Sequence, residues 1–137
     1  MRFAACLWAC SALLADAQSY PQRPVRLIIP FPAATSPDVV MRIVGPIISE
    51  MWGQPMIIDN RTGASGNLGA NAVATAAADG HTLLYTVNSV ICANPHLFPK
   101  MPFDTGANAL SGSFGKIVRD DHAKWGKVIR DANIKPE

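Results

Sequence analysis

The chain has 137 residues, 49% of them hydrophobic, and a formal net charge of +2. This length suffices for one small domain. Acidic and basic residues are interspersed, without the basic stripe or aromatic platform that nucleic-acid-binding proteins present, which excludes that class.

The first 17 residues have the pattern of a secretory signal. Arg2 supplies a positive charge, Phe3–Leu14 is apolar but too short to span a bilayer, and residues 15–17 (ADA) match a small-x-small cleavage site. We therefore predict export to the periplasm with cleavage after Ala17. A lipid anchor on Cys10 and a retained membrane anchor are the alternatives. Cleavage would leave Cys92 as the only cysteine, so the fold must stand without an intramolecular disulfide.

The next elements are a strand and a helix. Val25–Ile29 is a short apolar run that predicts a buried strand, ended by Pro30. A helix follows, with Ser36 as N-cap, Pro37 at its first position and Asp38 in its first turn. Gly45-Pro46 inside the helix predicts a kink or a break. Helical spacing predicts one apolar face, made of Val40, Ile43, Val44, Ile47, Ile48 and Met51.

The middle of the chain repeats this alternation. Met56–Asp59 predicts a second strand, residues 60–66 a glycine-rich loop, and residues 67–78 an alanine-rich helix. Thr82–Val87 predicts a third strand, rich in Thr, Leu, Tyr and Val. Residues 88–103 predict a loop with at most one helical turn, at residues 95–98.

The last third predicts a linker and a helix. Residues 104–113 contain few large apolar side chains, which indicates a linker. Residues 114–132 predict an amphipathic helix with a frayed end after it. Its predicted apolar face consists of Phe114, Ile117, Val118, Trp125, Val128, Ile129 and Ala132.

The order strand, helix, strand, helix, strand with short loops predicts an α/β fold with a short parallel sheet, because parallel neighbours need crossover helices. Ligands of such sheets bind beyond the carboxyl ends of the strands, where residues 31–38, 60–67 and 88–96 fall. The first of these segments leads into a helix N-terminus, whose free N–H groups favour an anion.

Several motifs together resemble the tripartite tricarboxylate transporter receptors, also called the Bordetella uptake gene family. They are YPQRPVRLIIPFPA followed by Asp38, the helix end WGQP, DNRTGASGNLGA, ATAAADGHTLLYTVNSVICANPHLF, MPFD, and the terminal HAKWGKVIRDANIKPE. The resemblance covers nearly all of the chain after the signal.

The resemblance implies a periplasmic receptor of the two-lobed type II binding-protein architecture. Such a receptor is no enzyme, needs no metal or cofactor, binds small carboxylates and delivers them to a membrane permease. It further implies that loop amides and bridging waters hold the carboxylate. By position, the ligand-binding residues are Phe31, Ala33, Ala34, Thr35, Ser36, Asp38, Ser65, Asn67, Thr86, Asn88, Ser89 and Asn94.

Two departures from the family pattern stand out. The first loop carries Ala33-Ala34-Thr35 where the family has glycines, and we expect Ala34 to forbid a positive φ and so to shift the loop. Family members run to roughly 300 residues, about two lobes. We therefore expect residues 18–104 to be part of lobe one, residues 105–113 to be a linker or the seam of an internal deletion, and residues 114–137 to be a C-terminal helix.

Three alternatives remain. A non-functional fragment of such a receptor is the first. The second is a dehydrogenase fragment, because Thr62–Gly69 resembles a dinucleotide loop, although no acidic residue ends the next strand. The third is chemistry at Cys92 and His96, which are four residues apart but too few for a zinc site.

Overall fold

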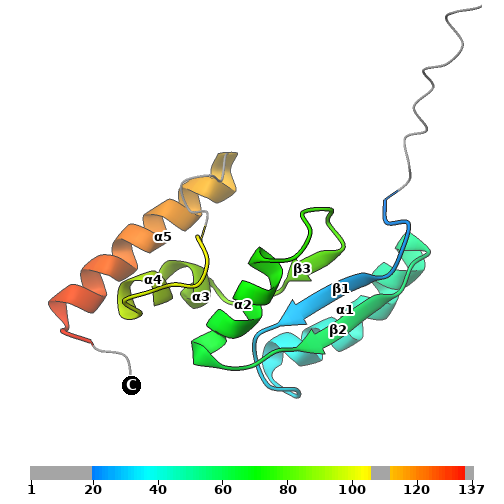
Figure 1. The fold of residues 1–137 in the computed structure, drawn as a ribbon, viewed down its shortest axis with the longest axis horizontal. Coiled ribbons are helices and arrows are strands. Elements are labelled where there is room, and N and C mark those ends of the chain that lie inside the picture. Colours follow the sequence, from blue (N-terminus) through cyan, green and yellow to red (C-terminus); the bar gives the residue numbers. More distant parts are fainter. Residues whose placement is uncertain (1–19, 106–111, 135–137) are drawn as a thin grey trace, which may run out of the picture.

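The computed structural model describes residues 20–105 and 112–134. The predicted signal, residues 1–17, and most of the predicted linker lie outside these ranges. Figure 1 shows a small sheet with helices on both sides and a long C-terminal helix. The elements are β1 (Val25–Ile29), α1 (Ser36–Trp52), β2 (Met56–Asn60), the 3-10 turn η1 (Ala64–Gly66), α2 (Asn67–Ala74), β3 (Thr82–Leu84), α3 (Asn88–Cys92), α4 (Asn94–Leu97) and α5 (Gly112–Asp131).

The sheet is parallel, with β1 in the middle and β2 and β3 on either side. Leu27 of β1 lies opposite Ile58 of β2 and Leu83 of β3. Both faces of β1 are covered, which is why its sequence is an almost continuous apolar run. The predicted α/β class and the predicted bounds of the first strand are confirmed.

The first crossover, through α1, runs from β1 to β2, and the second, through α2, runs back from β2 past β1 to β3. Because such connections are right-handed and these two run in opposite directions across the sheet, α1 and α2 lie on opposite faces (Figure 1). Met41 of α1 packs against Leu27 and Ile29. On the other face α2 contacts β1 and β3. The sheet therefore has its core on both sides, but each side is only one helix thick.

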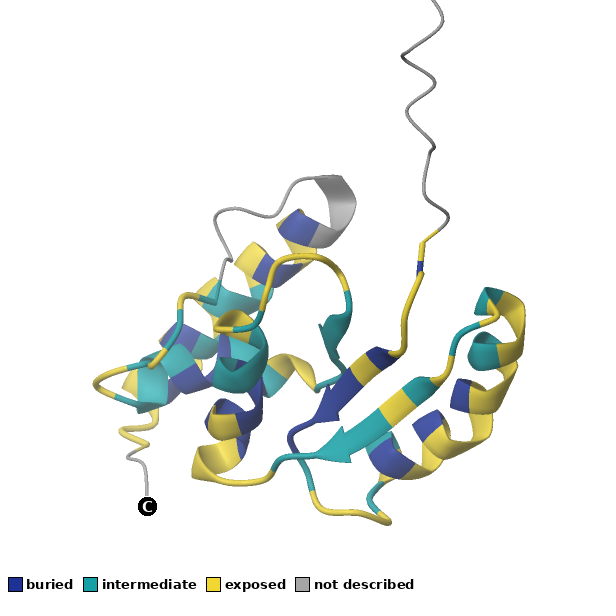
Figure 2. Cartoon of the chain, turned by 45° about the vertical axis from the view of Figure 1, so that its right-hand side comes forward, coloured by how far each residue is buried: buried dark blue, intermediate teal, exposed yellow. Residues whose placement is uncertain are grey.

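The predicted apolar face of α1 is wrong for most of its residues, although Ile48 does pack against the core. Met41 and Gly45 are buried on the sheet, whereas Ile43, Ile47 and Met51 are 66%, 56% and 79% exposed. Figure 2 shows this division, with buried positions toward the sheet and exposed ones outward. Gly45 faces the sheet, because a Cβ at this position would lie 3.7 Å from Met56 Sδ of β2. Helical periodicity in a largely apolar helix does not specify which side is buried.

The predicted break at Pro46 is also wrong, because α1 runs without interruption from Ser36 to Trp52. Pro46 lies on the exposed side of the helix, where water can bond the carbonyl group that the proline leaves without a donor. The helix ends at Gly53, which has a φ of +64° and an N–H that donates to the Glu50 carbonyl.

Other element bounds differ from the prediction. The N-cap of α1 is Thr35 rather than Ser36. Helix α2 ends at Ala74, four residues early, and β3 ends at Leu84, because only its three residues pair with β1. Residues 88–97 form two short helices: α4 matches the helical turn predicted at residues 95–98 within one residue, whereas α3 lies where a loop was predicted.

Helix α5 packs on α3 and α4, away from the sheet. Val118 and Trp125 pack with Cys92, and His96 Nε2 donates a hydrogen bond of 2.9 Å to the His122 carbonyl. A Cβ at Gly126 would lie 2.6 Å from the His96 ring, so the close approach requires glycine there. Ile117 and Val128 are exposed although they were predicted on the buried face, and the side chain of Phe114 lies outside the described part. No helix within residues 20–105 and 112–134 has the length and hydropathy needed to cross a bilayer.

Candidate functional site

The candidate site lies where the chain leaves the carboxyl ends of β1 and β3. The strand order reverses direction between these two strands, and open α/β sheets form a crevice at such a point. The loop of residues 30–35, here called the first loop, follows β1. The segment of residues 61–66 follows β2, and Tyr85–Val87 follows β3.

Asp38 folds the first loop onto the start of α1. Its Oδ2 accepts hydrogen bonds of 2.8 Å from the Ala34 N–H and from Arg42 Nε. These two donors, Arg42 before Ala34, lower the pKa of Asp38 to about 2. The Asp38 side chain is 1% exposed, so it braces the loop from beneath.

Asn60 ties the second strand to the same loop. Its Nδ2 donates to the Phe31 carbonyl at 3.1 Å, and its Oδ1 accepts from Arg42 Nη2 at 3.3 Å. Asn60 is not among the ligand-binding residues predicted from the sequence. Its position at the end of a strand, next to a glycine-rich loop, was the available signal.

Ala34 adopts the positive φ that its side chain was expected to forbid. Its φ is +66°, in the left-handed region that L-residues rarely occupy. The bond from its N–H to Asp38 holds this conformation, so the loop keeps a shape that glycine adopts without strain. We expected Ala34 to shift the loop by forbidding a positive φ. That reason is wrong, because Ala34 adopts the positive φ that a glycine would adopt.

The N-terminus of α1 has no side-chain cap. The N-cap residue is Thr35, but its hydroxyl donates to the Pro32 carbonyl at 2.7 Å instead of accepting from the helix. Ser36, the first helical residue, is exposed. Pro37 has no N–H and the Val39 N–H donates to the Thr35 carbonyl at 2.9 Å, so the N–H groups of Ser36 and Asp38 are the ones that the helix itself leaves without an acceptor. Ala33 is exposed beside it. This end of a 17-residue helix can therefore accept an anion.

The wall opposite the first loop is formed by η1 and α2. Gly66 and Gly69 approach Pro30 so closely that a Cβ at Gly69 would lie 2.8 Å from Pro30 Cβ and 2.7 Å from the Arg61 carbonyl oxygen. The glycines of the Thr62–Gly69 motif thus serve packing between loops, which gives the dinucleotide alternative no support.

Asn67 and Asn94 are buried in this wall and bond to one another. Asn94 Nδ2 donates to Asn67 Oδ1 at 2.8 Å and to the Ser65 carbonyl at 3.0 Å. Both side chains therefore join α4 to η1 and are not free to meet a solute. Ser65 itself is exposed and has a φ of +53°, so its side chain remains available at the rim.

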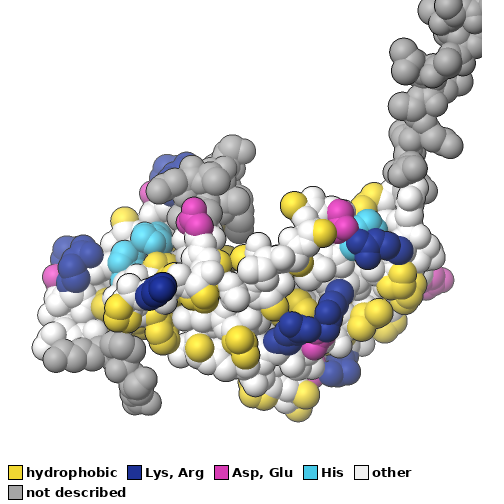
Figure 3. All heavy atoms as spheres, in the orientation of Figure 1, with side chains coloured by type: hydrophobic (Ala, Val, Ile, Leu, Met, Phe, Trp, Pro, Cys, Tyr) yellow, Lys and Arg dark blue, Asp and Glu magenta, His cyan; other side chains and the backbone are white. Residues whose placement is uncertain are grey.

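The arginines near the site are already paired with acids. Arg26 and Arg61 both bind Asp59, at 2.5 Å and 2.9 Å, and Arg42 binds Asp38. Figure 3 shows basic side chains (dark blue) next to acidic ones (magenta) on the side of the molecule that carries β1 and β2. A bound anion would therefore depend on backbone amides more than on a free arginine.

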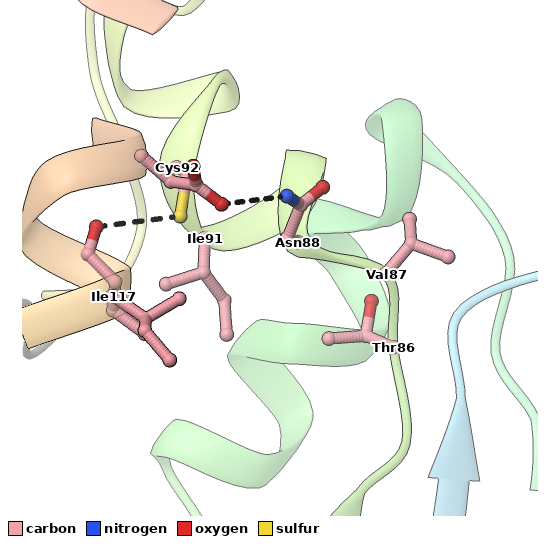
Figure 4. A pocket seen from close by; sticks show the side chains of 8 residues that line it. Thr86, Val87, Asn88, Ile91, Cys92 and Ile117 are labelled. Carbon is pink, nitrogen blue, oxygen red and sulfur yellow. Dashed lines mark hydrogen bonds between the residues drawn. The ribbon is translucent and has the colours of Figure 1, made fainter. Parts of the chain in front are cut away.

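The third predicted segment turns toward α5. Thr86 and Asn88 line a cavity of about 190 Å³ between α3 and α5 (Figure 4). Asn88 Nδ2 donates to Asp121 Oδ2 at 3.1 Å. Ser89 is half-buried in α3. Asp121 and Ile117, which also line the cavity, were missed because nothing in the sequence places α5 against α3.

Cys92 and His96 do not form a reactive pair. The Cys92 thiol donates to the Val118 carbonyl at 3.7 Å, whereas His96 bonds to His122, so each side chain serves the packing of α5. Burial raises the pKa of the Cys92 thiol, and the charge of Asp121 raises it further. No group of three or more potential metal ligands occurs within the described ranges.

Comparison with known proteins identifies the fold and the family. Residues 40–113, more than half of the chain, match the tripartite tricarboxylate transporter family receptor model. The chain is 42% identical over 98 residues to a UPF0065 protein of Bordetella bronchiseptica, covering 72% of this chain and 29% of that protein.

Two similar solved structures come from Rhodopseudomonas palustris. MatC with bound malate is 37% identical with a TM-score of 0.59, and a second protein, solved with adipate, is 34% identical with a TM-score of 0.60. The matches cover 63% and 64% of this chain and 29% of each structure. The chain thus spans less than a third of the length of these relatives and has the α/β fold of part of lobe one of a periplasmic binding protein. By this match the chain belongs to the tripartite tricarboxylate transporter receptor family.

Proposed function

We propose that the chain is a periplasmic receptor that binds a small carboxylate and feeds a tripartite tricarboxylate-type permease. The observation that carries this proposal is the uncapped N-terminus of α1 beside the braced first loop, at the point where the strand order reverses. The malate and adipate present in two related structures are dicarboxylates. The signal-like residues 1–17 support the compartment.

Binding by the described part should be weak. The first loop and η1 would enclose a ligand from one side only, whereas good sites bury about 70–90% of the ligand surface. We therefore expect a Kd of about 1 mM for malate or adipate, near the weak end of specific binding.

Ala33 offers a direct test, because it is exposed beside the start of α1. Ala33→Asp adds a negative charge next to the N–H groups that would hold the carboxylate, so we expect malate affinity to fall by about tenfold, or 1.4 kcal/mol. Ala33→Asn introduces a side chain of the same size as Asp but without its charge, and it should retain the parental affinity for malate. Calorimetric titration with malate, adipate, citrate and glutamate measures both.

Equal malate affinity in the two Ala33 variants would contradict the site, and no heat with any of the four acids would contradict the function. The alternative of a non-functional fragment is favoured by the exposed apolar side of α1. Absence of a cooperative thermal transition in the parental chain would support that alternative.

A further inference from the structure

We propose that the cavity between α3 and α5 binds a small organic cation with an apolar body. This site goes beyond the carboxylate site of the first loop. Its volume is about 190 Å³, and cavities of roughly 150 Å³ hold a molecule the size of benzene. Most of its wall is apolar, formed by Val87, Ile91, Cys92, Ile117 and Val118.

The charge of the cavity selects the ligand class. Among the described residues that line it, Asp121 is charged and none is a Lys, Arg or His. Its Oδ2 accepts a hydrogen bond from the neutral Asn88 amide, and no ion pair joins Asp121 to a Lys or Arg within the described ranges. A carboxylate beside an apolar wall attracts a cation and repels an anion more strongly than it would in bulk water.

Thr86 supplies a second polar contact. Its Oγ1 is buried and has no hydrogen-bond partner within the described part of the chain. A hydroxyl in that position can accept a hydrogen bond from an ammonium group while the apolar body of the ligand lies against Ile91 and Ile117. Figure 4 shows these side chains pointing toward the same space, with the Asn88 amide at its edge.

The cavity is separate from the first loop because α3 stands between them. Val90 of α3 faces Gly66, where a Cβ would lie 2.9 Å from its Cγ2, whereas Ile91 and Cys92 face α5. Thr86 and Asn88, predicted to contact a carboxylate, therefore line a cavity whose charge is negative. We therefore assign Thr86 and Asn88 to the cation site and not to the carboxylate site.

Three probes of one shape test the proposal on the full chain. Benzylammonium, benzyl alcohol and benzoate are cation, neutral molecule and anion, respectively. Calorimetry, with NMR shifts at Ile91 and Ile117 to locate the probe, should show benzylammonium binding about tenfold tighter than benzyl alcohol. Benzoate should cause no shift at these two residues.

Variants assign the effect to Asp121. Asp121→Asn should bring benzylammonium down to the affinity of benzyl alcohol, and Asp120→Asn, a neighbouring exposed carboxylate paired with Lys116, should leave both affinities unchanged. Ile117→Trp fills the cavity from a half-exposed position, so it should abolish binding of both probes while melting temperatures stay near the parental value.

The proposal is overturned if benzylammonium binds equally well to Asp121→Asn, if benzoate shifts Ile91 and Ile117 as strongly as benzylammonium does, or if no probe binds. Loss of malate binding in Ala33→Asp with benzylammonium binding intact separates the two sites. Failure of malate binding in the parental chain contradicts the proposed function alone.

Discussion

At the scale of single residues, Asp38 shows how one buried carboxylate shapes the first loop. It accepts from the Ala34 N–H and from Arg42, and so stabilises the positive φ of Ala34. The position of Asp38 at the start of the helix was predictable from the sequence, whereas its burial was not, because burial depends on the loop that closes over it. The conformation of Ala34 was unpredictable for the same reason.

The stability of the fold should depend on pH through Asp38. Its folded pKa of about 2 lies below the ordinary value, so the folded state is stabilised above about pH 4 and loses that stabilisation as pH falls toward 2. Asp38→Asn should lower the melting temperature at neutral pH and flatten its decline between pH 4 and 2. Asp131→Asn, a control at an exposed carboxylate on α5 paired with Lys127, should leave that decline in place. Identical pH profiles for Asp38→Asn and the parental chain would refute this role.

At the scale of elements, two helical glycines differ in whether the packing of their helix requires them. Gly69 lets α2 approach Pro30 and the Arg61 carbonyl, whereas Gly45 faces β2 with room for a Cβ. Neither position has a positive φ, so only packing distinguishes them. The sequence shows both as glycines within helical patterns, where a glycine usually costs stability.

Alanine substitutions at these two positions should have opposite effects. Gly69→Ala places a Cβ 2.7 Å from a backbone oxygen and should destabilise the fold by about 1–3 kcal/mol. Gly45→Ala makes ordinary contacts at 3.7 Å and 3.8 Å and should stabilise it by about 0.5–1 kcal/mol through helix propensity. Urea unfolding of both variants measures the difference. A Gly69→Ala variant as stable as Gly45→Ala would contradict the view that close packing requires glycine at position 69.

At the scale of the whole molecule, the outer side of α1 is an apolar surface exposed to solvent. Val40, Ile43, Ile47 and Met51 are all more than a third exposed, and β2 is an edge strand beneath the helix. Large exposed apolar surfaces promote association. We therefore expect the chain to self-associate as its concentration rises.

The double substitution Ile43→Gln and Ile47→Gln should suppress this association and change the free energy of unfolding by no more than about 0.5 kcal/mol for each site, because both side chains are exposed. Met41→Gln, on the buried side of α1, should instead destabilise the fold by about 2–5 kcal/mol. Light scattering during gel filtration, together with thermal melts, measures both properties. A double variant that associates like the parental chain would show that another surface is responsible.

The sequence by itself determined the parallel α/β sheet and the bounds of β1, because these depend on apolar runs and turn residues that are local in the chain. It also determined the family, because the family motifs are short contiguous stretches of sequence. Only the tertiary structure decided which side of α1 is buried, that Asn67 and Asn94 bond to one another, and that α5 closes a cavity over Thr86 and Asn88. Each of these depends on contacts between segments far apart in the sequence. Periodicity and propensity carry no information on which distant surfaces will meet.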